Sequence, residues 1–227
     1  MDIHFNIILA RYNLNFTKME FTMKNTLLSI ALISASLSSS VLADSHISGE
    51  TSTVASPNWN YIQGSYASAD ATGFDLSGVA VNGSRLIGDN FFLMAGYSLL
   101  SDDVSGFDFD LDYAELSLGL GYRYAVNSSS DVYVAVSYED RALETSGGGF
   151  RDKDSVNGYG VQVGLRSLVT DNIELSGSLG MVSIDSESDT VFGLGANYFF
   201  NESFSAGVGY SSSDDIDITS LNVRYSF

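Results

Sequence analysis

Seven charged residues stand on the polar side of segments that alternate between polar and apolar side chains. They are Glu115, Arg123, Glu139, Arg141, Arg166, Glu174 and Arg224. Carboxylate and guanidinium groups that are withdrawn from water must pair with opposite charges or with hydrogen-bonding partners. We therefore expect an internal network of salt bridges and hydrogen bonds that also includes Gln162 and Asn222. A narrow conduction path lined by these charges is the alternative.

The residues that most often act as catalytic bases or nucleophiles are scarce. The two His residues, His4 and His46, both precede the alternating segments, and the chain has no Cys. His is the commonest general base, and a chain without Cys has no thiol nucleophile, thiolate metal site or disulfide. Pairs of Asp are not distinctive among 28 acidic residues. The sequence therefore predicts no catalytic residue, no cofactor and no enzymatic activity.

A run of alternate Asp residues suggests a different chemistry. Asp108, Asp110 and Asp112 lie in an acidic segment, and residues 185–189 and 214–217 are acidic as well. On an extended backbone, alternate side chains project to one side, and Ca²⁺ or Mg²⁺ requires several oxygen ligands. Weak binding of divalent cations is one hypothesis. Solvated surface charge is the alternative, because the spacing of an EF-hand loop is absent.

The segment 146–151 reads Ser-Gly-Gly-Gly-Phe-Arg. A Gly run that presents Phe150 and Arg151 is a candidate surface contact, since aromatic and Arg residues anchor many interfaces. A mobile loop without a partner is the alternative.

The amino-terminal region has the features of an export signal. Residues 23–43 read MKNTLLSIALISASLSSSVLA, with a Lys after Met23, an apolar stretch and small residues up to Ala43. This order predicts a secretory signal peptide that is cleaved after Ala43. Met23 is then the expected start, and residues 1–22 are an upstream extension or a misassigned start. The polar residues 44–58 are expected to form a flexible leader.

The chain after Ala43 is strongly acidic, with seven basic and 26 acidic residues. Such a chain repels nucleic acid phosphates and offers no basic patch to anionic lipid headgroups. We therefore expect no nucleic-acid partner.

From Trp59 onward the chain consists of alternating runs. The clearest is residues 113–124, and others are 132–141, 157–166, 173–182, 190–200 and 204–211. One face of each run is aliphatic with aromatic residues towards the ends, and the other carries Gly, Ser and isolated charges. Period-two alternation of this kind predicts β-strands with one apolar face.

The connections between the runs alternate in length. Short ones lie at residues 88–90, 127–131, 170–172 and 201–203, and longer or more acidic ones at 69–75, 101–112, 144–155, 184–189 and 212–217. Asn, Asp and Gly in the short connections suit tight turns. The count predicts ten strands. Eight is the alternative, because residues 76–86 alternate poorly and a bulge or a register change is expected near Arg85.

The last residues carry the most specific pattern. Leu221, Val223, Tyr225 and Phe227 form an apolar face, and the chain ends on the aromatic residue. This segment resembles the closing strand of bacterial outer-membrane β-barrels, in which the pattern is read by the barrel-assembly machinery. Residues 59–227 as a whole resemble the small outer-membrane β-barrel superfamily, the group related to the transmembrane domain of outer-membrane protein A.

The resemblance implies an all-β fold, an antiparallel transmembrane up-and-down β-barrel at residues 59–227. Its outside would face lipid between aromatic girdles, its interior would be polar, and both termini would lie in the periplasm. The implied partners are outer-membrane lipid, lipopolysaccharide and the barrel-assembly machinery, with divalent cations at the acidic loops. A non-enzymatic role in envelope integrity, adhesion or surface recognition is expected, and a narrow porin-like channel for small solutes or ions is the alternative.

Overall fold

The computed structural model describes residues 56–71, 74–103, 109–147, 150–185, 187–213 and 216–227. The predicted signal peptide, residues 1–22 and the leader up to residue 55 lie outside these ranges. Within the described residues, no helix has the length and apolar character needed to cross a membrane. The strands are β1 (Tyr61–Ala71), β2 (Phe74–Ile87), β3 (Phe91–Asp103), β4 (Phe109–Asn127), β5 (Ser130–Gly147), β6 (Phe150–Thr170), β7 (Ile173–Ile184), β8 (Glu187–Phe199), β9 (Phe204–Ser213) and β10 (Ile216–Ser226).

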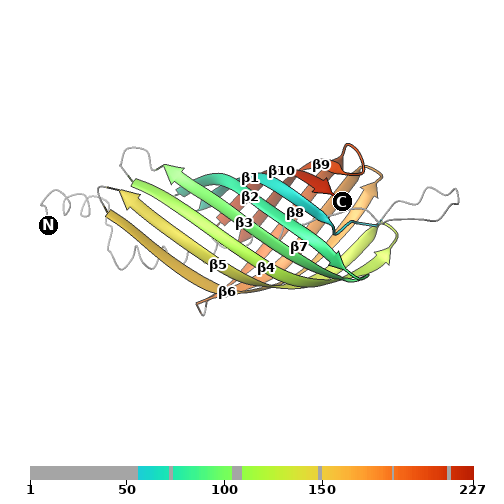
Figure 1. Cartoon of the computed structure of the whole chain (residues 1–227), viewed down its shortest axis with the longest axis horizontal. Coiled ribbons are helices and arrows are strands. Elements are labelled where there is room, and N and C mark those ends of the chain that lie inside the picture. Colours follow the sequence, from blue (N-terminus) through green and yellow to red (C-terminus); the bar gives the residue numbers. More distant parts are fainter. Residues whose placement is uncertain (1–55, 72–73, 104–108, 148–149, 186, 214–215) are drawn as a thin grey trace, which may run out of the picture.

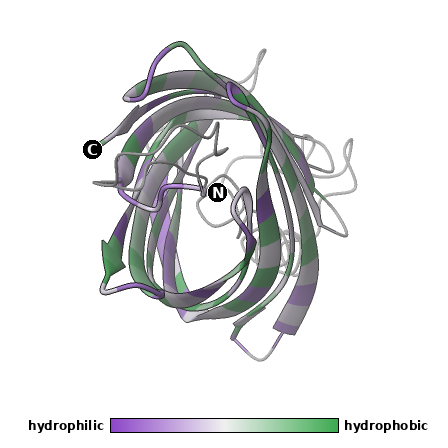
Figure 2. Ribbon diagram, turned by 90° about the vertical axis from the view of Figure 1, so that its right-hand side faces the viewer, coloured by the Kyte–Doolittle hydropathy of each residue, from purple (hydrophilic) through white to green (hydrophobic). Residues whose placement is uncertain are grey.

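The ten strands form one closed antiparallel barrel in which each strand pairs with its neighbours in the sequence and β1 pairs with β10. Figure 1 shows the strands side by side, and Figure 2 shows the closed ring from the end at which the chain terminates. The prediction of an all-β up-and-down barrel with ten strands is confirmed, and the alternative of eight strands is wrong. Closure pairs both edges of the sheet, so no edge strand remains along the barrel wall.

The strands are staggered around the barrel. Following paired residues from Ser68 through β2, β3 and β4 leads to Glu144 in β5, whereas the opposite way round leads to Val132. A closed barrel with tilted strands requires such a stagger. Residues that lie at one level of the interior are therefore not the ones that face each other in the hydrogen-bonded register.

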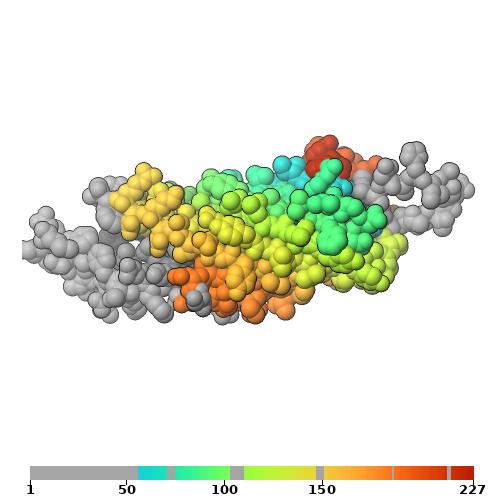
Figure 3. Space-filling view, turned by 60° about the horizontal axis from the view of Figure 1, so that its bottom comes forward, coloured from blue at the N-terminus to red at the C-terminus, as the bar shows by residue number. Residues whose placement is uncertain are grey.

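The two ends of the barrel differ. At the turn end, which carries Asn60 and Phe227, the connections are short; at the opposite end, here called the loop end, β4, β5 and β6 run beyond the other strands (Figures 1 and 3). The prediction of a loop at residues 144–155 is largely wrong, because β5 and β6 pair continuously up to Gly147 and Phe150. This pairing satisfies backbone groups that a loop would leave to water.

The bulge or register change expected near Arg85 is absent, since β2 pairs without interruption with both β1 and β3. Register shifts occur instead at Ala125/Asn127 and Leu168/Thr170, beside the short turns. The Arg85 side chain is exposed on the outer face, with its guanidinium carbon 5.5 Å from the ring centroid of Phe227.

The outer face carries the apolar side chains. Its aromatic residues form two rows, one nearer the loop end (Tyr66, Tyr97, Tyr138, Tyr159, Phe192 and Tyr210) and one at the turn end (Phe91, Tyr122, Tyr198, Phe204, Tyr225 and Phe227). Leu and Val residues between the rows are about half exposed, for example Leu118 at 49% and Val163 at 52%. Such a surface is unfavourable in water and favourable in lipid, and two aromatic rows are typical of a barrel that spans a bilayer.

Candidate functional site

The interior of the turn end is organised around Trp59, which precedes β1 and is only 1% exposed. Its ring centroid lies 4.1 Å from that of Phe92 and 5.3 Å from that of Tyr133. The guanidinium carbon of Arg166 lies 4.1 Å from the centroid of the indole ring, and the indole Nε1 donates a hydrogen bond of 2.8 Å to Asp131. The indole therefore has aromatic, cationic and hydrogen-bonding partners, which fix both its position and its orientation.

Ion pairs surround this indole. Asp131 binds Arg123 at 2.8 Å, and Glu174 binds Arg166 at 3.3 Å and Arg224 at 3.7 Å. All of these side chains are fully buried except that of Arg123, which is 18% exposed. Mutual pairing offsets part of the desolvation penalty of the buried charges. We call Trp59, Phe92, Tyr133 and these five charged residues the Trp59 layer.

The segment at residues 56–60 is bound to the barrel at several points. The Ser56 hydroxyl donates to Asp131 at 3.3 Å, and the Asn58 carbonyl accepts a hydrogen bond from Arg166 at 3.2 Å. The carbonyl of Asn60 accepts a hydrogen bond of 3.1 Å from the backbone N–H of Phe227. Residues 56–58, which the sequence assigned to the end of the leader, thus contribute to the Trp59 layer.

A second cluster lies inside the barrel towards the loop end. The Tyr113 hydroxyl donates to Glu115 at 2.8 Å, and the Ser117 hydroxyl donates to Glu139 at 3.1 Å. Arg141 stands directly opposite Glu115 in the β4–β5 register. All five side chains are 1% exposed or less. This cluster is bordered by buried aliphatic side chains of β1, β2, β3 and β10, such as Leu76 and Leu100.

The structure therefore divides the seven charged residues singled out in the sequence between two clusters. Glu115, Glu139 and Arg141 meet towards the loop end, whereas Arg123, Arg166, Glu174 and Arg224 meet at the turn end. Sequence reasoning missed Trp59 as an interior residue and placed Asp131 in a turn. Alternation along β5 could have identified Asp131 as an interior residue. It lies two residues before the buried Tyr133 and therefore on the same face of the strand.

Inward glycines make room for the rings that hold Trp59. A Cβ on Gly121 would overlap the Phe92 ring, and a Cβ on Gly164 would lie 2.5 Å from the Tyr133 ring. A glycine leaves space inside a barrel, but at these two positions a neighbouring aromatic side chain occupies that space. The glycines are thus part of the packing of the Trp59 layer.

We expect Gly164→Ala to loosen the Trp59 layer, because the added methyl group displaces the Tyr133 ring that packs on the indole. Overpacking of this kind lowers stability by about 1–3 kcal/mol. Trp59 is the only Trp in the chain, so its emission reports this layer directly. The variant should show a red-shifted emission and stronger quenching by acrylamide.

The matched control is Gly177→Ala, because Gly177 faces outward and the nearest side-chain atom, of Leu194, lies 3.7 Å from the added Cβ. Emission and quenching of this control should equal those of the wild type. Emission of the Gly164→Ala variant equal to that of the wild type would contradict the packing role of that glycine.

The other candidate residues lie on the outer face or outside the described residues. Arg151 is exposed in β6 and forms a salt bridge with Glu144, and the side chain of Phe150 lies outside the described part of the chain. Asp110 and Asp112 are exposed on β4, whereas Asp108 is not among the described residues. Within the described residues, no three His, Cys, Asp or Glu side chains gather closely enough to hold a metal ion. The cation site stays a prediction.

The four residues of the terminal pattern lie on the outer face of β10 and just beyond it. Leu221, Val223, Tyr225 and Phe227 are 62%, 62%, 43% and 53% exposed. The rings of Tyr225 and Phe227 lie 6.2 Å apart, and Tyr225 also contacts Phe204 at 5.1 Å. Their role as an assembly signal stays a prediction.

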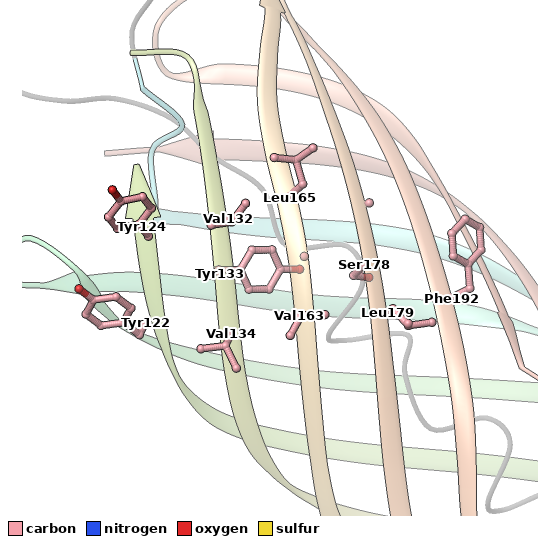
Figure 4. Close-up of a pocket in the computed structure, with 12 residues that line it drawn as sticks. Tyr122, Tyr124, Val132, Tyr133, Val134, Val163, Leu165, Ser178, Leu179 and Phe192 are labelled. Carbon is pink, nitrogen blue, oxygen red and sulfur yellow. The ribbon is translucent and has the colours of Figure 1, made fainter. Parts of the chain in front are cut away.

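A groove of about 710 Å³ lies on the outside of the barrel across β4 to β8 (Figure 4). Outward side chains such as Val132, Val163 and Leu179 line it, together with Gly177. The lining is mostly apolar, so the groove suits contact with lipid.

The closed barrel, its apolar outside and its paired polar interior define an outer-membrane β-barrel. Residues 29–190 match the model of the outer membrane protein beta-barrel domain family, and the chain belongs to this family. The protein is therefore located in the bacterial outer membrane. No curated protein matches the chain in sequence.

Several solved barrels are similar in structure. The KdgM porin shares 13% identity over 74% of this chain and 99% of its own, with a TM-score of 0.45. The NanC porin shares 5% identity over 73% of this chain and 100% of its own, with a TM-score of 0.49. The N-terminal barrel of Pseudomonas aeruginosa OprF shares 14% identity over 74% of this chain and 98% of its own, with a TM-score of 0.40.

Proposed function

We propose that this protein is a non-enzymatic surface barrel, closed at its turn end, which acts in envelope integrity, adhesion or surface recognition. The Trp59 layer is the observation that supports a closed interior. It combines Trp59, two further aromatic rings and five mutually paired charges within the turn end. An ion that crossed this layer would have to separate buried ion pairs, and breaking such a pair costs about 3–5 kcal/mol.

The part of the barrel that supports a recognition role is the loop-end extension, formed by residues 109–112, 143–147 and 150–157. Pairing between β6 and β7 begins only at Gly158 and Ile184, so residues 150–157 project beyond β7. The extension carries exposed charges of both signs, among them Asp112, Arg151 and Asp154. With the termini in the periplasm, as the family resemblance implies, this hairpin would stand on the cell surface.

The proposal also covers the partners. The two aromatic rows would contact outer-membrane lipid and lipopolysaccharide, and the barrel-assembly machinery would insert the folded strands. The acidic residues of β4 and of the loop-end extension would attract divalent cations near the lipopolysaccharide headgroups. A non-enzymatic role agrees with the positions of the two His residues, His4 and His46, which both precede the barrel.

Shortening the β5–β6 hairpin tests the recognition role. Thr145 pairs with Asp152 and Glu144 with Lys153, so replacing residues 145–152 with Asn-Gly keeps the register and removes the tip. We expect binding of bacteria that carry this variant to host cells or an abiotic surface to fall to the level of bacteria without the protein.

The control is Glu202→Gln, an exposed position in a turn-end connection. It should leave binding unchanged, and a heat-modifiability gel should show both variants folded in the outer membrane. Undiminished binding by the shortened barrel would contradict the recognition role of the hairpin.

The second candidate function is a narrow channel. It is favoured by the interior between the two charged clusters, where inward residues are small and neutral, among them Ser65, Gly96 and Ser220. A polar wall of small side chains is what a solute path would need. Conductance separates the two functions.

A further inference from the structure

A wall of neutral polar side chains lies between the Trp59 layer and the cluster around Glu115. It consists of Ser65, Asn82, Ser98, Ser220 and Asn222, which face the interior from β1, β2, β3 and β10 and are all 7% exposed or less. Ser65 stands opposite Asn222 on one side and opposite Ala80 on the other, and Ser98 stands opposite Ala80. These five residues, here called the neutral wall, are thus neighbours across four adjoining strands.

Several polar atoms of the neutral wall have no hydrogen-bond partner among the described residues. They are both amide atoms of Asn82, the hydroxyls of Ser98 and Ser220, and the carbonyl oxygen of the Asn222 side chain. A buried polar atom without a partner costs about 1–3 kcal/mol. Since these atoms face one interior surface, a molecule that hydrogen-bonds to several of them would remove much of this cost.

The chemistry of the neutral wall selects the kind of molecule. It offers amide and hydroxyl groups that both donate and accept, and it contains no charged side chain. The nearest cation, Arg224, already binds Gln63 at 2.9 Å and Glu174 at 3.7 Å. A bound anion would therefore remain without a free counter-charge, which a buried site does not tolerate.

The spacing of the neutral wall also bears on the size of the molecule. Neighbouring strands lie about 4.7–4.9 Å apart, so the unpartnered atoms on β10, β2 and β3 are spread over more than one strand spacing. One water cannot reach all of them, whereas a chain of adjacent hydroxyl groups can. We propose that the neutral wall is a binding site for a small neutral polyhydroxylated molecule, a polyol or small sugar. The proposal goes beyond the function proposed above, because a closed barrel can hold such a molecule as well as a conducting one.

Ribitol is a suitable probe, with gluconate as a charged comparison of similar length. The protein, purified from outer membranes in detergent, should give a saturation-transfer NMR signal with ribitol and none with gluconate. Asn82→Leu and Asn222→Leu each remove hydrogen-bonding atoms and should weaken ribitol binding by about tenfold or more. Asn157→Leu, at an exposed position on the outer face of β6, should bind like the wild type.

A heat-modifiability gel establishes that each variant is folded. If the Leu variants do not fold, Ser98→Ala and Ser220→Ala remove single hydroxyls with little change in volume and should still weaken binding. Absence of a ribitol signal would mean that the neutral wall holds water only, and would overturn the proposal. Equal binding of gluconate, or binding unaffected in every folded neutral-wall variant, would overturn it as well. None of these results depends on conductance or on surface binding, so they leave the proposed function to its own tests.

Discussion

The wild-type protein in a planar bilayer is expected to show no discrete conductance steps, whereas Trp59→Ala is expected to produce them. The substitution removes the indole that contacts Phe92, Tyr133, Arg166 and Asp131 at the turn end. Without it, the two rings lose their packing partner and Asp131 loses a hydrogen-bond donor. Truncation of a buried Trp also lowers stability by about 3–5 kcal/mol, so folding of the variant must be checked on a heat-modifiability gel.

The matched control for this experiment is Phe91→Ala. Phe91 belongs to the aromatic row at the turn end, but its side chain is 52% exposed on the outer face. The Phe91→Ala variant should therefore show no discrete conductance steps, like the wild type. Discrete steps in the wild type, of the same size as those of the Trp59 variant, would show that the Trp59 layer does not close the interior. The narrow channel would then be the better description of the protein.

The fold could be predicted because its main determinant is local. Alternation along a strand depends on neighbouring residues alone, and runs such as residues 113–124 display it without interruption. The ends of β5 and β6 were predicted less well, since Gly147 and Phe150 flank a Gly-rich segment that is typical of a loop. What extends these strands is the pairing of β5 with both β4 and β6, and a single sequence does not display such pairing.

The interior could be predicted only in part. Alternation along the strands indicates that Arg166 and Glu174 face inward, but it does not indicate how far along the barrel axis each residue lies. The level depends on the stagger of the closed sheet, which brings Glu174 of β7 to both Arg166 of β6 and Arg224 of β10. Trp59 precedes β1 and is held by contacts with distant strands, so alternation along the chain does not reveal its position in the interior. The level of a residue along the axis and its contacts with distant strands arise only when the barrel closes. The alternation of neighbouring residues does not reveal them.

The second large effect is expected from deletion of Phe227, which should sharply lower the amount of folded protein in the outer membrane. In the structure, this residue makes several contacts where β10 closes the barrel against β1. Its backbone N–H donates to Asn60 at 3.1 Å, next to the pairing of β10 with β1. Its ring lies 6.2 Å from that of Tyr225 and 5.5 Å from the guanidinium carbon of Arg85. Deletion removes these contacts and the terminal aromatic residue that, by the family resemblance, the assembly machinery reads.

The matched control is Phe200→Ala, which removes an aromatic side chain near the turn end that is somewhat more exposed, at 64% against 53% for Phe227. Membrane fractionation and a heat-modifiability gel measure folded barrel for both variants at equal expression. If the terminal position matters, the deletion should leave most of the protein unfolded or degraded in the periplasm, while Phe200→Ala should assemble nearly as well as the wild type. Equal losses in the two variants would assign the effect to lipid contact by aromatic side chains in general. Unchanged levels after the deletion would remove Phe227 from the assembly signal altogether.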